Sequence, residues 1–156
     1  MKMNGRRALI GFTLIWILDS NGNGTFDAGT DQAFAFGGAS GDVPVVGDWD
    51  GSGKDRIGLF RSGFFWILDV NGDGVLNNIN EAGGDQTFAF GGVAGDVPVV
   101  GDWNGDGRDK VGLFRDGFFW VLDANGNRQF DGTEPGQDLA YAFGGMLGDI
   151  PIVGKW

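Results

Sequence analysis

The chain has 156 residues, a net charge of −10, and neither cysteine nor histidine. The acidic balance, without any basic block, argues against a nucleic-acid partner, whose phosphates require Lys and Arg contacts. The two missing side chains exclude thiolate nucleophiles, Cys/His zinc sites and imidazole bases. With 14 Phe and 6 Trp, the chain is too apolar for disorder and long enough for one domain with a core.

The N-terminal residues allow two interpretations. A basic start and an apolar run of 11 residues, at positions 8–18, are typical of a signal peptide. Alternatively, residues 6–19 are strands, because they align with residues 56–69. The alignment favours strands, and we expect no membrane insertion, since crossing a bilayer takes ~20 apolar residues.

One short pattern divides the chain into repeats. Gly-Asp-Val-Pro at residues 41–44 recurs at residues 95–98 and, as Gly-Asp-Ile-Pro, at residues 148–151. A period near 50 residues indicates a propeller or a solenoid. We therefore predict a single repeat domain, residues 1–156. Its repeats cover about residues 6–47, 48–101 and 102–156.

The second repeat predicts four short strands. They are residues 57–61, 64–68, 86–90 and 97–101, with a two-residue Ser62-Gly63 turn between the first two. Pro98 lacks an N–H, so the fourth strand should begin there or lie at an edge. No segment has a sustained helical period.

The fold class is therefore all-β, with three four-stranded antiparallel repeats per chain. A four-stranded unit of this length fits a β-propeller blade better than a solenoid rung. We expect Trp16, Trp66 and Trp120 to pack in the blade cores. Because propellers close with four to eight blades, we expect oligomerisation to complete the ring. A homodimer would give six blades and a homotrimer nine.

An acidic loop follows the second strand of every repeat. Asp or Asn occupies loop positions 1, 3, 5 and 9, and glycine position 6 of the first two loops, whereas Arg128 replaces it in the third. Calcium needs six to eight oxygen ligands in such a sharp bend, as in the first half of an EF-hand loop. The alternative is a set of plain Asx turns. The candidate calcium ligands are Asp19, Asn21, Asn23, Asp27, Asp69, Asn71, Asp73, Asn77, Asp123, Asn125, Asn127 and Asp131.

A second kind of acidic loop follows the fourth strand. Position 9 is basic here, Arg56 or Lys110, and such a residue cannot ligate a metal ion but can neutralise the carboxylates itself. Whether these loops bind calcium is therefore open, and the third copy has Lys155 at position 1. The candidate ligands are Asp48, Asp50, Ser52, Asp55, Asp102, Asn104, Asp106 and Asp109.

These motifs resemble the FG-GAP/VCBS-type repeats of bacterial surface and secreted proteins, which are related to the integrin alpha-subunit propeller. The resemblance rests on Asp-Val-Pro-Val-Val-Gly-Asp-Trp, Gly-Leu-Phe-Arg and Phe-Trp-Ile-Leu-Asp-x-Asn-Gly, and it covers essentially the whole chain. It implies a calcium-binding, usually extracellular propeller used in adhesion or ligand binding. Arg56 and Lys110 depart from the family's Asp at position 9, and the family's propellers carry about seven blades on one chain.

The leading functional expectation is a non-enzymatic, calcium-stabilised binding or assembly module, extracellular or at a cell surface. A lectin-like module is an alternative, in which Trp49 and Trp103 stack on a carbohydrate. The favoured interpretation of these two tryptophans is instead that they cap the core between blades. A filament or tube subunit is another, arising when head-to-tail contacts fail to close a ring. Partners would be other copies of the chain and either carbohydrate or a surface protein. We expect no enzyme, because the acidic residues repeat with the loops.

Overall fold

The computed structural model describes residues 15–154, and the chain divides into two compact units, residues 1–40 and 41–156. In the first unit, β1 (Ile15–Leu18) and β2 (Gln32–Ala35) form an antiparallel pair with Trp16 opposite Phe34. The strand predicted at residues 14–19 is thus present. The two interpretations of the preceding residues fall outside the described part of the chain.

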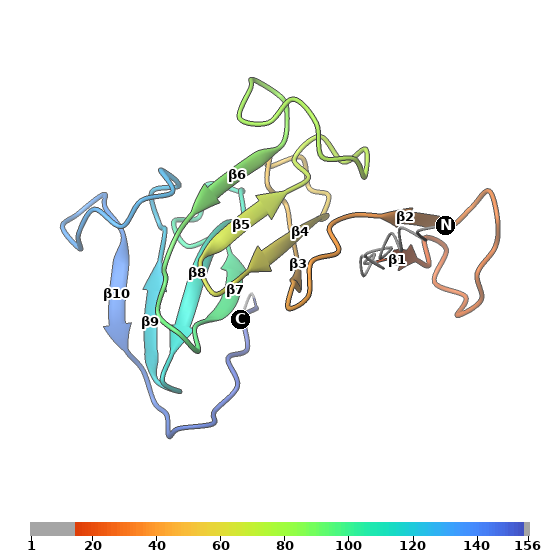
Figure 1. Ribbon diagram of the computed structural model, residues 1–156. Coiled ribbons are helices and arrows are strands. Elements are labelled where there is room, and N and C mark those ends of the chain that lie inside the picture. Colours follow the sequence, from red (N-terminus) through yellow and green to blue (C-terminus); the bar gives the residue numbers. More distant parts are fainter. Residues whose placement is uncertain (1–14, 155–156) are drawn as a thin grey trace, which may run out of the picture. The chain divides into compact units, whose positions relative to one another are not determined.

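The second unit contains two four-stranded antiparallel sheets in which neighbouring strands follow one another along the chain (Figure 1). The first sheet is β3 (Val43–Gly47), β4 (Arg56–Arg61), β5 (Phe65–Leu68) and β6 (Gln86–Ala89). The second sheet is β7 (Val97–Gly101), β8 (Lys110–Arg115), β9 (Phe119–Leu122) and β10 (Leu139–Ala142). The all-β fold class is therefore confirmed. Over residues 15–154, no helix is long and apolar enough to cross a membrane.

The sheets are offset by one strand from the predicted repeats. The strand expected to close the second repeat, β7, pairs instead with β8, and Val97 lies opposite Phe114. A short acidic loop joins β7 to β8 as a hairpin, whereas residues 90–96 carry the chain away from β6. As expected, Pro98 lies in an edge strand, where its missing N–H breaks no ladder. The described residues form two four-stranded sheets and one two-stranded sheet, not a closed ring.

A tight turn and an ion pair lie at one end of each four-stranded sheet. The predicted Ser62-Gly63 turn has φ values of 56° and 78°, and its equivalent at Asp116-Gly117 has 54° and 79°. Beside the second turn, Arg115 holds Asp96 in two hydrogen bonds of 2.7 and 2.9 Å. Burial opposes ionisation of Asp96, but the Arg115 and backbone N–H bonds outweigh it and lower the pKa of this carboxyl.

The main core lies between the two sheets. The face of the first sheet that bears Trp66 packs against β8 of the second sheet. Gly91 is required at this contact, because a Cβ there would lie 2.2 Å from Leu113 Cδ1. The cluster consists of Val45, Trp49, Phe60, Trp66, Leu68, Val70, Phe90, Val111 and Leu113.

Leu113 tests the inter-sheet core. Leu113→Ala should lower the free energy of unfolding by about 2–5 kcal/mol, because this fully buried side chain would leave a cavity. The control Leu139→Ala, at a solvent-exposed position of β10, should cost much less. Equilibrium urea unfolding measures both, and equal losses would contradict the assigned core.

Candidate metal-binding loops

Three acidic loops, after β1, β5 and β9, share one backbone arrangement. The carboxylate at position 1 accepts the N–H of position 6, from Gly24 at 2.7 Å, Gly74 at 2.9 Å and Arg128 at 3.0 Å. Arg128 has φ 68°, close to the 77° and 74° of the two glycines. The third loop therefore forms despite lacking glycine, and the Arg128 guanidinium lies 5.5 Å from the Phe88 ring of the other sheet.

The side chains at positions 3, 5 and 9 of these loops meet one another. In the first loop, Asn21 and Asn23 both donate to Asp27 Oδ2, at 3.0 and 2.6 Å. These hydrogen bonds lower the pKa of Asp27. The same convergence occurs among Asn71, Asp73 and Asn77 of the second loop and among Asn125, Asn127 and Asp131 of the third. Three of the four positions that sequence spacing predicted as a set, positions 3, 5 and 9, are thus brought together in each loop.

A further aspartate, missed by sequence analysis, ties each loop to the following strand. Asp31 accepts the N–H groups of Ser20 and Asp27 at 2.8 and 2.7 Å. Asp85 likewise accepts those of Val70 and Asn77, and Asp138 accepts that of Asp131. Each of the three directly precedes the third predicted strand of its repeat. They were missed because insertions of unequal length place them at different distances along the chain from their loops.

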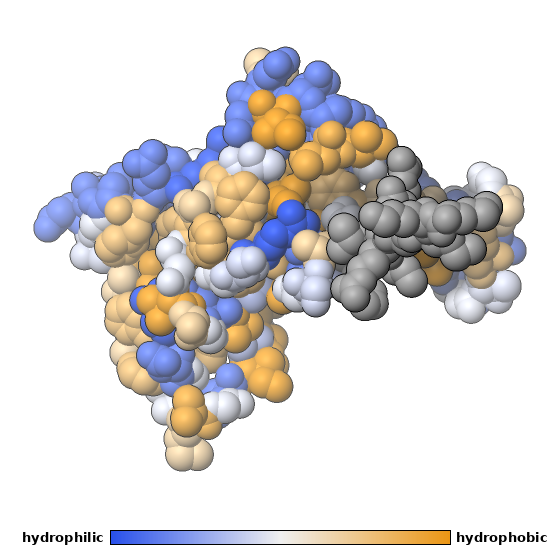
Figure 2. All heavy atoms as spheres, in the orientation of Figure 1, coloured by the Kyte–Doolittle hydropathy of each residue, from blue (hydrophilic) through white to orange (hydrophobic). Residues whose placement is uncertain are grey.

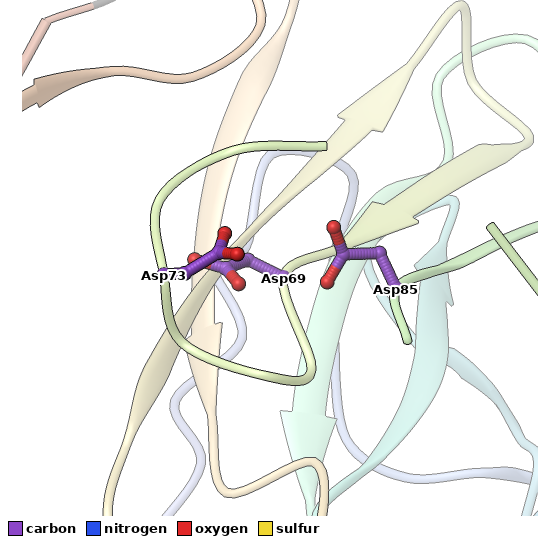
Figure 3. Close-up of side chains that lie close together, drawn as sticks. All are labelled: Asp69, Asp73 and Asp85. Carbon is purple, nitrogen blue, oxygen red and sulfur yellow. The ribbon is translucent and has the colours of Figure 1, made fainter. Parts of the chain in front are cut away.

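The second loop gathers three carboxylates. Oxygen atoms of Asp69, Asp73 and Asp85 all lie within 4.8 Å of one another, and Figure 3 shows Asp85 facing the other two from across the loop. Burial, with a smaller effect of the charges on Asp85 and Asp73, raises the pKa of Asp69. Backbone N–H bonds from Gly74 and Gly72 oppose that rise. The cluster has the charge and the oxygen atoms that a divalent cation would balance.

The third loop leaves buried carboxylate oxygens without a partner. Asp123 and Asp138 are 2% and 1% exposed, and the Oδ1 atom of each has no hydrogen-bond partner. Burial, and then the nearby charge of Asp138, raise the pKa of Asp123 to about 6. Leaving a buried acceptor unsatisfied costs about 1–3 kcal/mol. A cation at these oxygens would remove that cost. Among the described residues, however, only the second loop brings three carboxylates within 4.8 Å of one another.

The second kind of loop contains its own cation. Lys110 Nζ lies 2.7 Å from both Asn104 Oδ1 and Asp106 Oδ1, and 3.5 Å from Asp102 Oδ1. The Lys110 hydrogen bond lowers the pKa of Asp106 to about 2.

Arg56 occupies the corresponding place in the first sheet. Its guanidinium donates to Asp50 Oδ2 at 2.5 Å, to Ser52 Oγ at 3.4 Å and to the carbonyl of Val70. Asp48 accepts the N–H groups of Ser52 and Gly53 through its two oxygens. The expected neutralisation by the residue at position 9 is therefore present in both loops.

The position-8 aspartate of the second sheet, Asp109, does not turn into its own loop. Asp109 accepts the Asp48 N–H at 2.9 Å and donates its own N–H to the Asp48 carbonyl, so it joins the loops of the two sheets. Asp55 is exposed. Asp109, predicted as a candidate ligand of its own loop, therefore links two loops instead.

The two loop tryptophans differ in burial. Trp49 is buried in the inter-sheet core, and its indole N–H donates to the Ile57 carbonyl at 3.1 Å. It therefore presents no face to a sugar. Trp103 makes the equivalent bond to Val111 but is only half-buried, and it lines a pocket with Trp120, Tyr141 and Phe143.

Comparisons with protein-family models, with curated proteins and with solved structures found no match to this chain.

The raised pKa of Asp123 predicts an unusual pH dependence of the metal-free protein. Since the folded state holds this proton more tightly than the unfolded state, the stabilisation is present at low pH and lost as the pH rises through about 6. Between about pH 7.5 and 5, metal-free protein should gain about 1 kcal/mol, measured by urea unfolding with a chelator. Asp123→Asn should abolish the gain, and a gain that persists in this variant would refute the assignment.

Proposed function

We propose that this chain is a non-enzymatic, calcium-stabilised β-propeller module whose sheets act as blades and which completes its ring by binding further copies of itself. The observation that carries the proposal is a difference between two equivalent residues. Phe90 follows β6 and is 3% exposed, whereas Phe143 follows β10 and is 74% exposed. Both N–H groups bond to the same position of the neighbouring hairpin, so the local backbone is alike.

The whole face around Phe143 shows the same difference. Trp66 is fully buried and donates its indole N–H to the Phe90 carbonyl. Its equivalent, Trp120, is half-buried, and its Nε1 has no partner. Apolar side chains gather over the ends of β9 and β10 and over the segment after β10 (Figure 2). Exposed side chains on that segment are Met146, Leu147, Ile150 and Ile152.

The packing inside the chain indicates what would cover this face. In the first sheet, the equivalent face is covered by Val111 and Leu113 on β8 of the following repeat. The β4 counterparts of these residues, Ile57 and Leu59, are already buried within the chain. The proposed contact would therefore use another apolar segment of the second copy. Two chains would give six blades and three would give nine, within or near the usual range for closed rings.

Calcium is the proposed structural cofactor. The three loops after β1, β5 and β9 would hold it through oxygens at positions 1, 3, 5 and 9, and Asp138 Oδ1 would be a further ligand at the third loop. The unpaired buried oxygens of Asp123 and Asp138 and the cluster around Asp69 support this assignment. When bound, calcium would neutralise the crowded carboxylates and hold each loop closed. Extracellular calcium modules have dissociation constants of about 10⁻⁴–10⁻³ M. Calcium binding therefore suits an extracellular or cell-surface setting.

The resemblance to FG-GAP/VCBS-type repeats agrees with this proposal in its loops and strand order. Arg56 and Lys110 stand where the family carries aspartate. For this reason calcium is proposed only for the loops after β1, β5 and β9. Catalysis is not part of the proposal, since each acidic group described above has a repeated structural role in a loop or turn.

Self-association through the Phe143 face can be tested by substitution. Phe143→Ser should weaken association about 10- to 100-fold, since burying a Phe side chain is worth about 1.5–3 kcal/mol. Sedimentation equilibrium in calcium measures the dissociation constant. The control Val75→Ser changes an exposed apolar residue of an acidic loop and should have no effect. A wild-type monomer at about 100 µM would overturn the assembly proposal.

Calcium binding at the third loop predicts a second result. Asp138→Asn should remove about 1–3 kcal/mol of the stabilisation that calcium gives. This is the contribution expected of one site when the calcium concentration is about ten to a hundred times its dissociation constant. Thermal unfolding with calcium and with chelator measures this share. Asp116→Asn, the matched control, makes the same charge change at a hairpin turn. If chelation leaves wild-type stability unchanged, calcium has no structural role.

A lectin-like function is the second candidate, and the pocket around Trp103 is the observation that favours it. Trp103, Trp120, Tyr141 and Phe143 line a pocket open to solvent, and such rings can stack on a sugar face. Glycan-array binding that Trp103→Ala abolishes, in a protein that stays monomeric, would favour the lectin. Association that instead grows into filaments would indicate head-to-tail contacts that fail to close.

A further inference from the structure

We infer that Lys110 is a tethered cation that fills the loop of residues 102–110 in place of a metal ion, and that this loop is metal-independent. Four oxygen atoms surround the ammonium group: Asn104 Oδ1 and Asp106 Oδ1 at 2.7 Å, the Arg108 carbonyl at 3.0 Å and Asp102 Oδ1 at 3.5 Å. Counted from Asp102, these are positions 1, 3, 5 and 7. The first four ligand positions of an EF-hand calcium loop are the same, including the backbone carbonyl at position 7.

The neighbouring loop of the same sheet provides the comparison. Both loops start after strands that run in the same direction, β7 and β9, so they lie at the same end of the sheet. Residues 123–131 have Asp131 at position 9, and Asp123 Oδ1 has no partner. Residues 102–110 have Lys110 at position 9, and both Asp102 oxygens accept backbone N–H groups, from Gly105 and Gly107. In the loops of residues 19–27 and 69–77, which also lack a basic residue at position 9, backbone N–H groups satisfy both oxygens of Asp19 and of Asp69. The residue at position 9, and not the state of the first aspartate, therefore separates the two kinds of loop.

The lysine is enclosed as a structural cation would be. Its side chain is only 7% exposed, and three of its four oxygen contacts are within hydrogen-bond distance, one for each N–H of the ammonium group. Gly126 of the neighbouring loop covers the aliphatic stem, since a Cβ there would lie 3.4 Å from Lys110 Cε. An arriving calcium ion would have to displace a group that is covalently held in place.

Arg56 makes a related arrangement in the first sheet, with a different reach. It contacts positions 3 and 5 of its loop, Asp50 and Ser52, and it extends to the Val70 carbonyl of the adjacent acidic loop. The same inference therefore applies to residues 48–56, although Lys110 gives the sharper test because its four contacts lie within one loop.

The experiment converts the internal cation site into a metal site. Lys110→Asp places at position 9 the residue that Asp27 and Asp131 supply in the other loops. Isothermal titration calorimetry with calcium, on the full chain, should give one more site per chain in Lys110→Asp than in wild type. The double variant Lys110→Asp/Asp102→Asn should lose the additional site, which locates it. This result does not depend on whether the other three loops bind calcium.

Lys110→Met provides a second readout, because it removes the charge and keeps most of the stem. It should lower the melting temperature by about 5 °C or more in chelator, since several oxygens lose their cation. An unchanged number of sites in a folded Lys110→Asp variant would overturn the inference. So would a wild-type protein in which Asp102→Asn removes a calcium site.

Discussion

The structure depends on one electrostatic constraint, the burial of aspartate carboxylates directly after strands. Asp69 and Asp123 are nearly inaccessible to water, and each accepts backbone N–H groups that hold its loop in a tight turn. A buried charge is costly unless an opposite charge or a set of donors balances it. The chain meets this need in two ways. One kind of loop contains Lys110 or Arg56 at position 9, and in the other backbone N–H groups hold the first aspartate.

Because the sequence repeats, equivalent residues can be compared in two packing environments. Phe90 and Phe143 have the same neighbours along the chain and the same backbone hydrogen bond, yet only Phe90 lies in a core. The difference arises because the second sheet covers the first, and the face of the second sheet that bears Trp120 has no such cover in the described part of its unit. Burial of about 25 cal/mol per Å² of apolar surface makes such a face a natural site for association. Loops and faces therefore support one proposal, in which cations close the loops and further copies cover the face.

Strands and loop contacts were predictable from sequence because they depend on local pattern. The strands near Phe60, Trp66 and Phe88 follow from their flanking turns, and the convergence of Asn21, Asn23 and Asp27 follows from spacing within nine residues. Residues 97–101 were grouped with the second repeat but pair with β8, because the loop between β7 and β8 is a hairpin connection. Asp85 and Asp138 were missed because insertions of unequal length separate them from the loops that they hold. The burial of Trp49 agrees with the expectation that the loop tryptophans cap the core between blades, whereas Trp103, in the equivalent position, is only half-buried.

The central claim is that loops with an aspartate or asparagine at position 9 hold calcium and loops with a basic residue there do not. Native mass spectrometry of the wild-type protein in calcium, and then after chelation, measures the number of ions per chain directly. The account predicts three calcium ions per chain, carried by an oligomer and lost on chelation. A protein that retains no ion would contradict the calcium loops. Five ions per chain would show that Lys110 and Arg56 are displaced by metal.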